Sequence, residues 1–218
     1  MCVSREAFRY NFQFLILTLA VRIWVPAERK RIIATLGLKP GDKVLDHCCG
    51  LGGNLSPLCA AIAPGGSVEA MDHSPDMIEA STRLAKRRRL PVTVVQADAM
   101  QLPYPDETFD GVMHTGAINQ FGDQRQKAMD EILRVTKPGG VIAIQDEGMS
   151  EEMTHTRFGK FLIKQNAMFL DPIPTELVPD GVEATVGRVM AGLFYNIVFR
   201  KPEIGGQKPE VGDQQPGA

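Results

Sequence analysis

The sequence is poor in aromatic residues and nearly balanced in charge, and both shortages exclude functions. Phenylalanine, tyrosine and tryptophan make up 6% of the 218 residues, so the chain offers no obvious platform on which nucleic-acid bases would stack. Twenty-four Lys and Arg residues stand against 26 Asp and Glu residues, for a net charge of −2. This balance argues against general nucleic-acid binding through bulk charge. We therefore expect no nucleic-acid partner.

Cysteine is also scarce, and its positions exclude a disulfide framework. The four cysteines are Cys2, Cys48, Cys49 and Cys59, too few and too clustered for a secreted disulfide-rich domain. This usage fits a reducing, cytoplasmic setting. Cys48 and Cys49 are potential soft-metal ligands, but there is no CxxC pair, and no second Cys/His pair stands at zinc-finger spacing. We therefore expect no metal site.

Long hydrophobic runs are missing as well. The apolar run near the N-terminus spans residues 12–21 and is closed by Arg22, whereas a helix needs about 20 apolar residues to cross a bilayer. We expect residues 1–36 to form a helix that packs on the domain or acts as a lid over an apolar substrate, with peripheral contact to a membrane surface as the alternative. At the other end, Gly, Pro and Gln dominate residues 202–218, which predicts a disordered tail.

Between these ends, segments typical of strands and of helices alternate. Gly and Pro punctuate short apolar runs that predict strands at residues 43–47, 67–72, 91–96, 109–114 and 141–145. Helical patterns occupy residues 28–37, 55–63, 75–89, 124–136 and 154–169. Residues 182–189 and 193–200 predict a closing antiparallel pair. This alternation predicts one α/β domain, residues 37–201, with a mostly parallel sheet and right-handed crossovers.

Ligands of such sheets bind beyond the carboxyl ends of the strands, so the residues there are informative. Asp46 precedes a glycine-rich turn, residues 48–54, after the first strand. Asp72 follows the second strand and Asp98 the third, at an even spacing of 26 residues. Glycines let the backbone turn tightly and approach a ligand, and the turn leaves a helix N-terminus pointing at that ligand.

The three acids favour one kind of ligand. A carboxylate after the second strand suits a ribose diol, and one after the third strand can accept from an exocyclic amine such as that of adenine. An acid at the glycine turn repels a pyrophosphate but favours a cation. A ligand with an ammonium group, a ribose and an adenine but no phosphate is S-adenosylmethionine. A dinucleotide dehydrogenase is the competing interpretation, but Leu55 stands where its third glycine is needed.

The segments around these acids resemble the motifs of class I S-adenosylmethionine-dependent methyltransferases. The matching segments are residues 44–52, 68–77, 96–103 with 109–110, and 131–140. The resemblance spans residues 38–147 and implies an α/β, doubly wound, mostly parallel seven-stranded sheet, a Rossmann-like methyltransferase fold, with an antiparallel C-terminal strand pair. Within the superfamily the chain looks most like the ubiquinone and menaquinone biosynthesis C-methyltransferases. It departs from them at Cys48, where a glycine is usual, at His47 and at Ile118.

The resemblance also implies roles for individual residues in transfer of the sulfonium methyl group by in-line displacement. The expected cofactor-binding residues are Asp46, His47, Cys48, Gly50, Gly52, Asn54, Asp72, His73, Met77, Asp98, Ala99, Met100 and His114. Asp46 should hold the methionine ammonium, Asp72 the ribose hydroxyls and Asp98 the adenine. His114 follows the fourth strand and is our candidate for a catalytic base. The alternative is that it packs against the methionyl end of the cofactor.

The acceptor is expected to be a small or amphipathic apolar, lipid-like molecule. The apolar residues expected to roof its pocket are Phe12, Phe14, Leu15, Trp24, Phe158, Phe161, Met168 and Phe169. The same residues at helical spacing are also typical of ordinary core packing.

Two other functions stay open. One is a methyltransferase-like protein that binds the cofactor without turnover, suggested by Cys48. The other is a nucleic-acid methyltransferase, although residues 114–117 lack its Asn/Asp-Pro-Pro-aromatic motif. The oligomeric state is not predicted.

Overall fold

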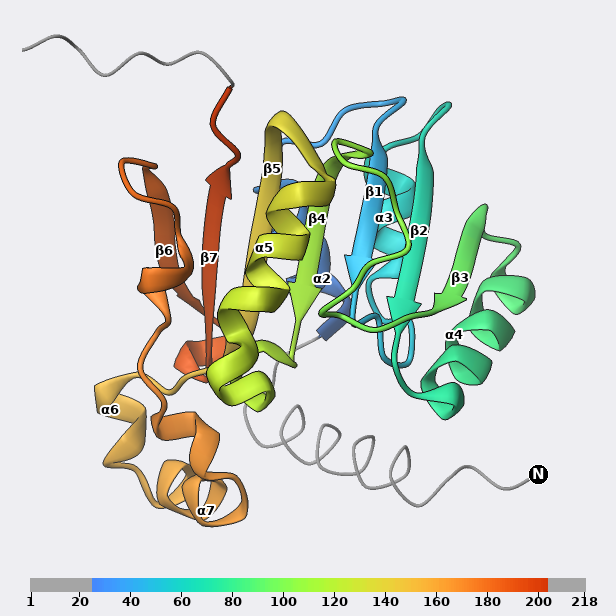
Figure 1. Ribbon diagram of the computed structural model, residues 1–218. Coiled ribbons are helices and arrows are strands. Elements are labelled where there is room, and N and C mark those ends of the chain that lie inside the picture. Colours follow the sequence, from blue (N-terminus) through green and yellow to red (C-terminus); the bar gives the residue numbers. More distant parts are fainter. Residues whose placement is uncertain (1–24, 204–218) are drawn as a thin grey trace, which may run out of the picture.

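Seven strands form a single sheet in the order β3-β2-β1-β4-β5-β7-β6 (Figure 1). The computed structural model describes residues 25–203, so residues 1–24 of the predicted lid and residues 204–218 of the predicted tail lie outside it. Strands β1 to β5 pair in parallel, whereas β7 runs antiparallel to both β5 and β6. The strands are β1 Lys43–His47, β2 Ser67–Asp72, β3 Val92–Gln96, β4 Phe109–Thr115, β5 Thr136–Glu147, β6 Ala184–Val189 and β7 Phe194–Arg200. The predicted doubly wound sheet with an antiparallel C-terminal pair is confirmed.

The helices connect these strands. They are α2 Val25–Ala34, α3 Leu55–Ala61, α4 Pro75–Arg88, α5 Arg125–Val135, α6 Glu151–Thr154 and α7 Arg157–Gln165. Short 3₁₀ turns add η1 Ile118–Gln124, η2 Ala167–Leu170, η3 Thr175–Leu177 and η4 Met190–Gly192. Within residues 25–203, every helix is too short or too polar to cross a membrane.

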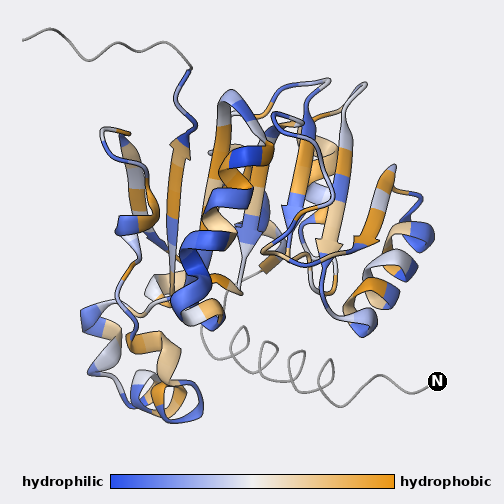
Figure 2. Cartoon of the chain, viewed as in Figure 1, coloured by the Kyte–Doolittle hydropathy of each residue, from blue (hydrophilic) through white to orange (hydrophobic). Residues whose placement is uncertain are grey.

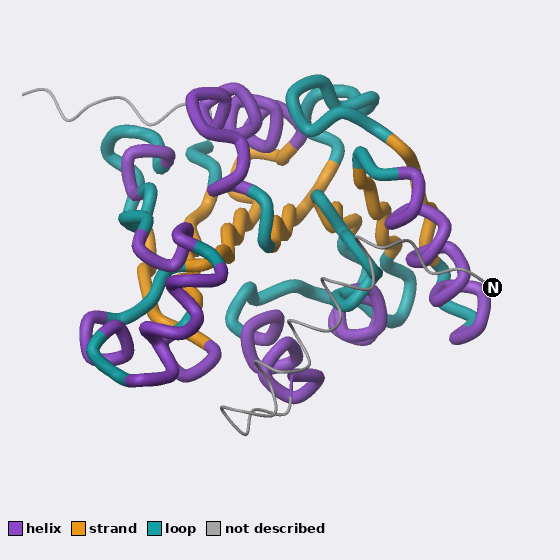
Figure 3. The backbone as a smooth tube through the Cα atoms, turned by 90° about the horizontal axis from the view of Figure 1, so that it is seen from below, coloured by secondary structure: helices purple, strands orange, loops and turns teal. Residues whose placement is uncertain are grey.

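Two apolar cores lie on opposite faces of the sheet, with helices over each (Figure 3). Strand side chains alternate between the faces: Val44 packs with residues of α2, α3 and α4, whereas Leu45 packs with residues of α5. Within residues 25–203, the strands are accordingly rich in hydrophobic residues, and the outer sides of the helices are largely polar (Figure 2). Ile32 and Ile33 of α2 are buried in the first core, so the described part of the predicted lid is packed into the domain.

The helix predicted near residues 154–169 is present but shorter, as α7, Arg157–Gln165. The chain forms α6 just before it and η2 just after it. The hydroxyl of Thr156 accepts a hydrogen bond from the backbone N–H of Gly159 at 2.8 Å, and the side chain of Asn166 accepts one from Met168 at 3.0 Å. Such local side-chain bonds compete with helical ones and divide the segment.

Residues 137–140, where Pro138, Gly139 and Gly140 locally favour a turn, form the irregular start of the long strand β5. Gly139 takes a φ of +71°, and its N–H donates to the carbonyl of Lys201 at 2.9 Å. The N–H of Lys201 in turn donates to the carbonyl of Gly140. Pairing with the chain that leaves β7 therefore extends the strand through a segment whose local sequence favours a turn.

Candidate functional site

A cleft of about 1280 Å³ opens at the carboxyl ends of β1, β2 and β4, which is more than a drug-sized ligand needs. It is lined by ten of the residues predicted to bind the cofactor: Cys48, Gly50, Gly52, Asn54, Asp72, His73, Met77, Asp98, Ala99 and Met100. The other three, Asp46, His47 and His114, are fully buried behind this lining. The structure thus gathers most of the predicted site on one edge of the sheet.

The turn after β1 is built from residues in the left-handed region of backbone space. Cys48, Gly50 and Gly52 have φ values of 59°, 52° and 77°. A Cβ atom at Gly50 would meet no atom within 4 Å, whereas one at Gly52 would lie 2.9 Å from the Leu55 side chain. Gly50 therefore presents open backbone to the cleft, and Gly52 allows the close packing of the turn against α3. Cys48 adopts the same conformation with a side chain, at a cost in strain.

Two carboxylates are held rigidly at the rim of the cleft. The Asp72 carboxylate accepts hydrogen bonds from the backbone N–H groups of Gly50 and Ser74, each at 2.9 Å. The Asp98 carboxylate accepts one from Met100 at 2.8 Å. Each carboxylate oxygen has a second lone pair. Both side chains can therefore accept further hydrogen bonds from a ligand without giving up the bonds that orient them.

Asp46 reaches the cleft only through Asn54. The amide of Asn54 donates to Asp46 at 3.0 Å, and its oxygen accepts from the Arg29 guanidinium at 2.9 Å. Burial raises the pKa of Asp46 to about 6, although the bond from Asn54 opposes this. The second carboxylate oxygen, Oδ2, has no hydrogen-bond partner within the described part of the chain. Asp46 therefore supplies negative charge beneath the floor of the cleft.

Several cleft residues were not predicted. They are Arg29 and Lys30 of α2, Arg88 of α4, and Thr115, Gly116, Ala117, Gln120, Phe121 and Gln124 after β4. The basic runs containing these cations look like solvated helix faces in the sequence, and only the packing of α2 against α3 brings Arg29 to the cleft. The residues after β4 could have been found, because they follow the carboxyl end of a central strand.

The predicted roof of the acceptor pocket needs correction. None of Phe158, Phe161, Met168 and Phe169 is among the described residues that line the cleft. Phe169 is buried in the core, where its ring meets that of Phe194 with centroids 6.1 Å apart. The helices α6 and α7 lie at the β6–β7 end of the sheet, away from β1 and β2 (Figure 1). The other predicted roof residues, Phe12, Phe14, Leu15 and Trp24, lie outside the described residues.

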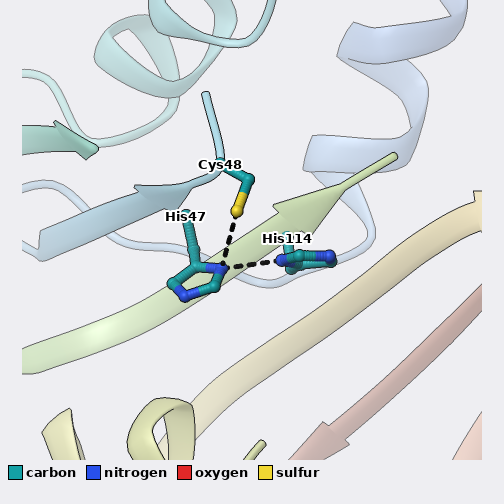
Figure 4. A group of neighbouring side chains, drawn as sticks. All are labelled: His47, Cys48 and His114. Carbon is teal, nitrogen blue, oxygen red and sulfur yellow. Dashed lines mark hydrogen bonds between the residues drawn. The ribbon is translucent and has the colours of Figure 1, made fainter. Parts of the chain in front are cut away.

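Behind the glycine turn lies a pair of buried histidines. His47 and His114 face each other in the register of β1 and β4, and their Nδ1 atoms are 2.7 Å apart (Figure 4). Burial lowers the pKa of His47 to about 4 and that of His114 well below its ordinary value. Both rings are therefore neutral at pH 7, with one Nδ1 donating and the other accepting. The catalytic-base role of His114 stays a prediction, which its burial away from the cleft does not favour.

Acidification should destabilise the protein through this pair. His47 binds its proton more weakly in the folded state than in the unfolded chain, so its contribution to stability is complete above about pH 6.5 and is lost as the pH falls toward 4. The free energy of unfolding should then fall by up to about 1.4 kcal/mol per pH unit for this histidine. Urea unfolding at several pH values between 7 and 4, compared between the wild type and His47→Gln, measures this slope.

His155 offers a matched control for that experiment, because it is exposed. His155→Gln should keep the wild-type slope, whereas His47→Gln should flatten it. The raised pKa of Asp46 increases stability as the pH falls through the same range. This contribution is common to the wild type and both variants, so it drops out of the comparison. Equal slopes in the wild type and in His47→Gln would contradict the expectation.

Comparisons with known proteins agree with this geometry. Residues 44–140 match a family model described as a methyltransferase domain. The chain is 32% identical to a demethylmenaquinone methyltransferase of Lysinibacillus sphaericus over 130 residues, which are 59% of this chain and 54% of that protein. The chain spans about half the length of the curated relatives it matches.

Solved structures share the fold at low sequence identity. A crystal structure of a SAM-dependent methyltransferase from Aquifex aeolicus aligns with a TM-score of 0.61 and 22% identity, over 79% of this chain and 89% of that chain. The [4+2]-cyclase SpnF aligns with a TM-score of 0.61 and 19% identity, over 82% of this chain and 81% of that chain. Together with the strand order and the glycine turn, these findings identify residues 44–140 as a methyltransferase domain in a chain with the Rossmann-like methyltransferase fold.

Proposed function

We propose that the chain transfers a methyl group from S-adenosylmethionine to a small or amphipathic apolar acceptor. The observation that carries the proposal is the placement of Asp72 and Asp98 beside the open backbone of Gly50 in one cleft. The unpartnered oxygen of Asp46 beneath the same cleft adds negative charge. This arrangement fits a cationic nucleoside that carries no phosphate.

Different residues bind different parts of that ligand. Asp72 accepts from the ribose hydroxyls, Asp98 accepts from the adenine amine, and Met77 and Met100 pack beside the base. Asn54, backed by Asp46, binds the methionine end. When bound, S-adenosylmethionine supplies an already activated methyl group, so the protein mainly positions the reactants and excludes water.

The acceptor is placed on the β4 side of the cleft. Phe121 supplies an apolar surface there, and Gln120 and Gln124 supply polar groups. The relative from Lysinibacillus sphaericus is named for a small-molecule acceptor, demethylmenaquinone, which supports an acceptor of small-molecule size. The proposed cofactor-binding domain is residues 37–201, to which α2 adds Arg29.

Incubation with methyl-labelled cofactor and fractionated cell extract tests the proposal. Label should enter the fraction that dissolves in organic solvent, and S-adenosylhomocysteine should suppress the transfer by competing for the cleft. Label in nucleic acid instead would favour a nucleic-acid methyltransferase. Cofactor binding without transfer to any fraction would favour a binding protein without methyl turnover.

A further inference from the structure

The buried histidine pair has a third member with metal-binding chemistry. Cys48 Sγ lies 3.6 Å from His47 Nδ1, and His47 Nδ1 lies 2.7 Å from His114 Nδ1 (Figure 4). One ligand atom from each of the three residues falls within 4.8 Å of the others. Two adjacent strands assemble the cluster from residues 67 positions apart. Spacing along the chain, on which the expectation of no metal rested, does not reveal it.

We propose that His47, Cys48 and His114 bind one divalent ion of the zinc class. Imidazole nitrogen and thiolate sulfur are the ligands that Zn²⁺ prefers, and three protein ligands with one open position are typical of its reactive sites. The cleft reaches the cluster at Cys48, which lines it. A fourth ligand could therefore enter from the cleft. The cluster adjoins the carboxylates proposed to hold the cofactor, because Cys48 and Asp72 line the same cleft.

The distances approach those of such an ion, with the ligand atoms of Cys48 and His114 within 4.8 Å of each other before an ion draws them together. Bonds of about 2.3 Å to sulfur and 2.0 Å to nitrogen in tetrahedral geometry place S and N about 3.5 Å apart and two nitrogens about 3.3 Å apart. The Cys48–His47 separation already has this value. The two Nδ1 atoms, now at hydrogen-bond distance, must separate by roughly 0.6 Å. The hydrogen bond between the two Nδ1 atoms is lost when the donor histidine moves its proton from Nδ1 to its own Nε2. The two Nδ1 atoms are then free to separate.

The electrostatics of the cluster also suit a cation. Neutral imidazole and thiolate are the forms of these side chains that bind metal. The carboxylates of Asp72 and Asp46 lie near Cys48. The same negative charges attract a divalent ion, which would displace the thiol proton to solvent. Binding therefore releases one proton and forms one metal–sulfur bond.

A histidine that binds a metal ion usually donates a hydrogen bond from its other ring nitrogen. The outer nitrogen of His114, Nε2, has no hydrogen-bond partner within residues 25–203, whereas the ring of His47 interacts with the backbone of Ala99. A histidine that binds metal through Nδ1 carries its proton on Nε2, where a carbonyl or water usually accepts it.

Titration of the untagged, chelator-treated protein with Co²⁺ tests the proposal, because a thiolate bound to cobalt gives a charge-transfer absorption in the near ultraviolet. We expect one equivalent of Co²⁺ to bind with that absorption and with the strong visible bands of a four-coordinate ion. One proton should be released per ion, and Zn²⁺ should displace the cobalt. Absence of the charge-transfer band, or failure of Zn²⁺ to displace the cobalt, would overturn the proposal.

Cys48→Gly is the variant of choice, because glycine tolerates the φ of +59° found there without strain. The variant should remain folded by circular dichroism, lose the charge-transfer band and bind cobalt about 100-fold more weakly or worse. Cys59→Ala, which removes a half-buried thiol on α3, should behave like the wild type. A band that persists in Cys48→Gly, or that disappears in Cys59→Ala, would place the cobalt elsewhere and overturn the proposal.

Discussion

Asp72→Ala should weaken the binding of S-adenosylmethionine by about 100-fold. The substitution removes the carboxylate proposed to accept from both ribose hydroxyls, and hydrogen bonds to a charged group contribute about 1.5–3 kcal/mol each. It also removes the acceptor for the N–H groups of Gly50 and Ser74, so the turn that supports the ligand loses its anchor. A loss of about 2.8 kcal/mol corresponds to that factor of 100, and titration calorimetry measures it directly.

Asp76 provides the matched control for this substitution. It is an exposed aspartate in the first turn of α4, four residues after Asp72, and it does not belong to the cleft lining. Asp76→Ala should change the affinity by less than a factor of about 3, as expected for a surface substitution. If Asp72→Ala bound the cofactor as tightly as Asp76→Ala does, the ribose-binding role of Asp72 would be wrong.

Phe109→Ala should lower the free energy of unfolding by about 3–5 kcal/mol. The ring is fully buried, packs edge-on against Tyr104 with centroids 5.0 Å apart, and lies under the ammonium group of Lys43. Alanine leaves a cavity at the start of β4, where the apolar core on the α5 face begins. Urea unfolding monitored by circular dichroism gives the change in free energy, and an unchanged m-value shows that two-state unfolding is preserved.

Phe161→Ala is the control for Phe109→Ala, because it makes the same substitution at an exposed side chain. Phe161 lies on α7 and is 51% exposed, so its truncation leaves no cavity and should cost less than about 1 kcal/mol. Similar losses in the two variants would mean that Phe109 does not occupy a tightly packed core position.

The fold could be predicted because its strands are visible in the sequence as short runs of apolar residues. Val44 and Leu45 are adjacent apolar residues that enter opposite cores, as expected for a strand covered by helices on both faces. The division of residues 154–169 into separate helices could not be predicted, because the apolar residues have helical spacing throughout that segment. The interruptions depend on how Thr156 and Asn166 use their side chains, a choice that neighbouring structure decides.

The site was predictable only in part, for a related reason. Asp72 and Asp98 end consecutive parallel strands, so their closeness follows from the βα repeat itself. The contact between His47 and His114 depends instead on β1 lying beside β4 in a particular register, which no local pattern encodes. The bond between Arg29 and Asn54 likewise depends on where α2 docks.

The central place of β1 in the sheet bears on the order of folding. Its partner on one side, β2, follows within 30 residues, whereas Val44 pairs on the other side with Gly111. During synthesis the first three strands are therefore complete while one edge of β1 is still uncovered. Closing that edge requires a long-range contact, which is slow to form and leaves an aggregation-prone strand exposed until it does.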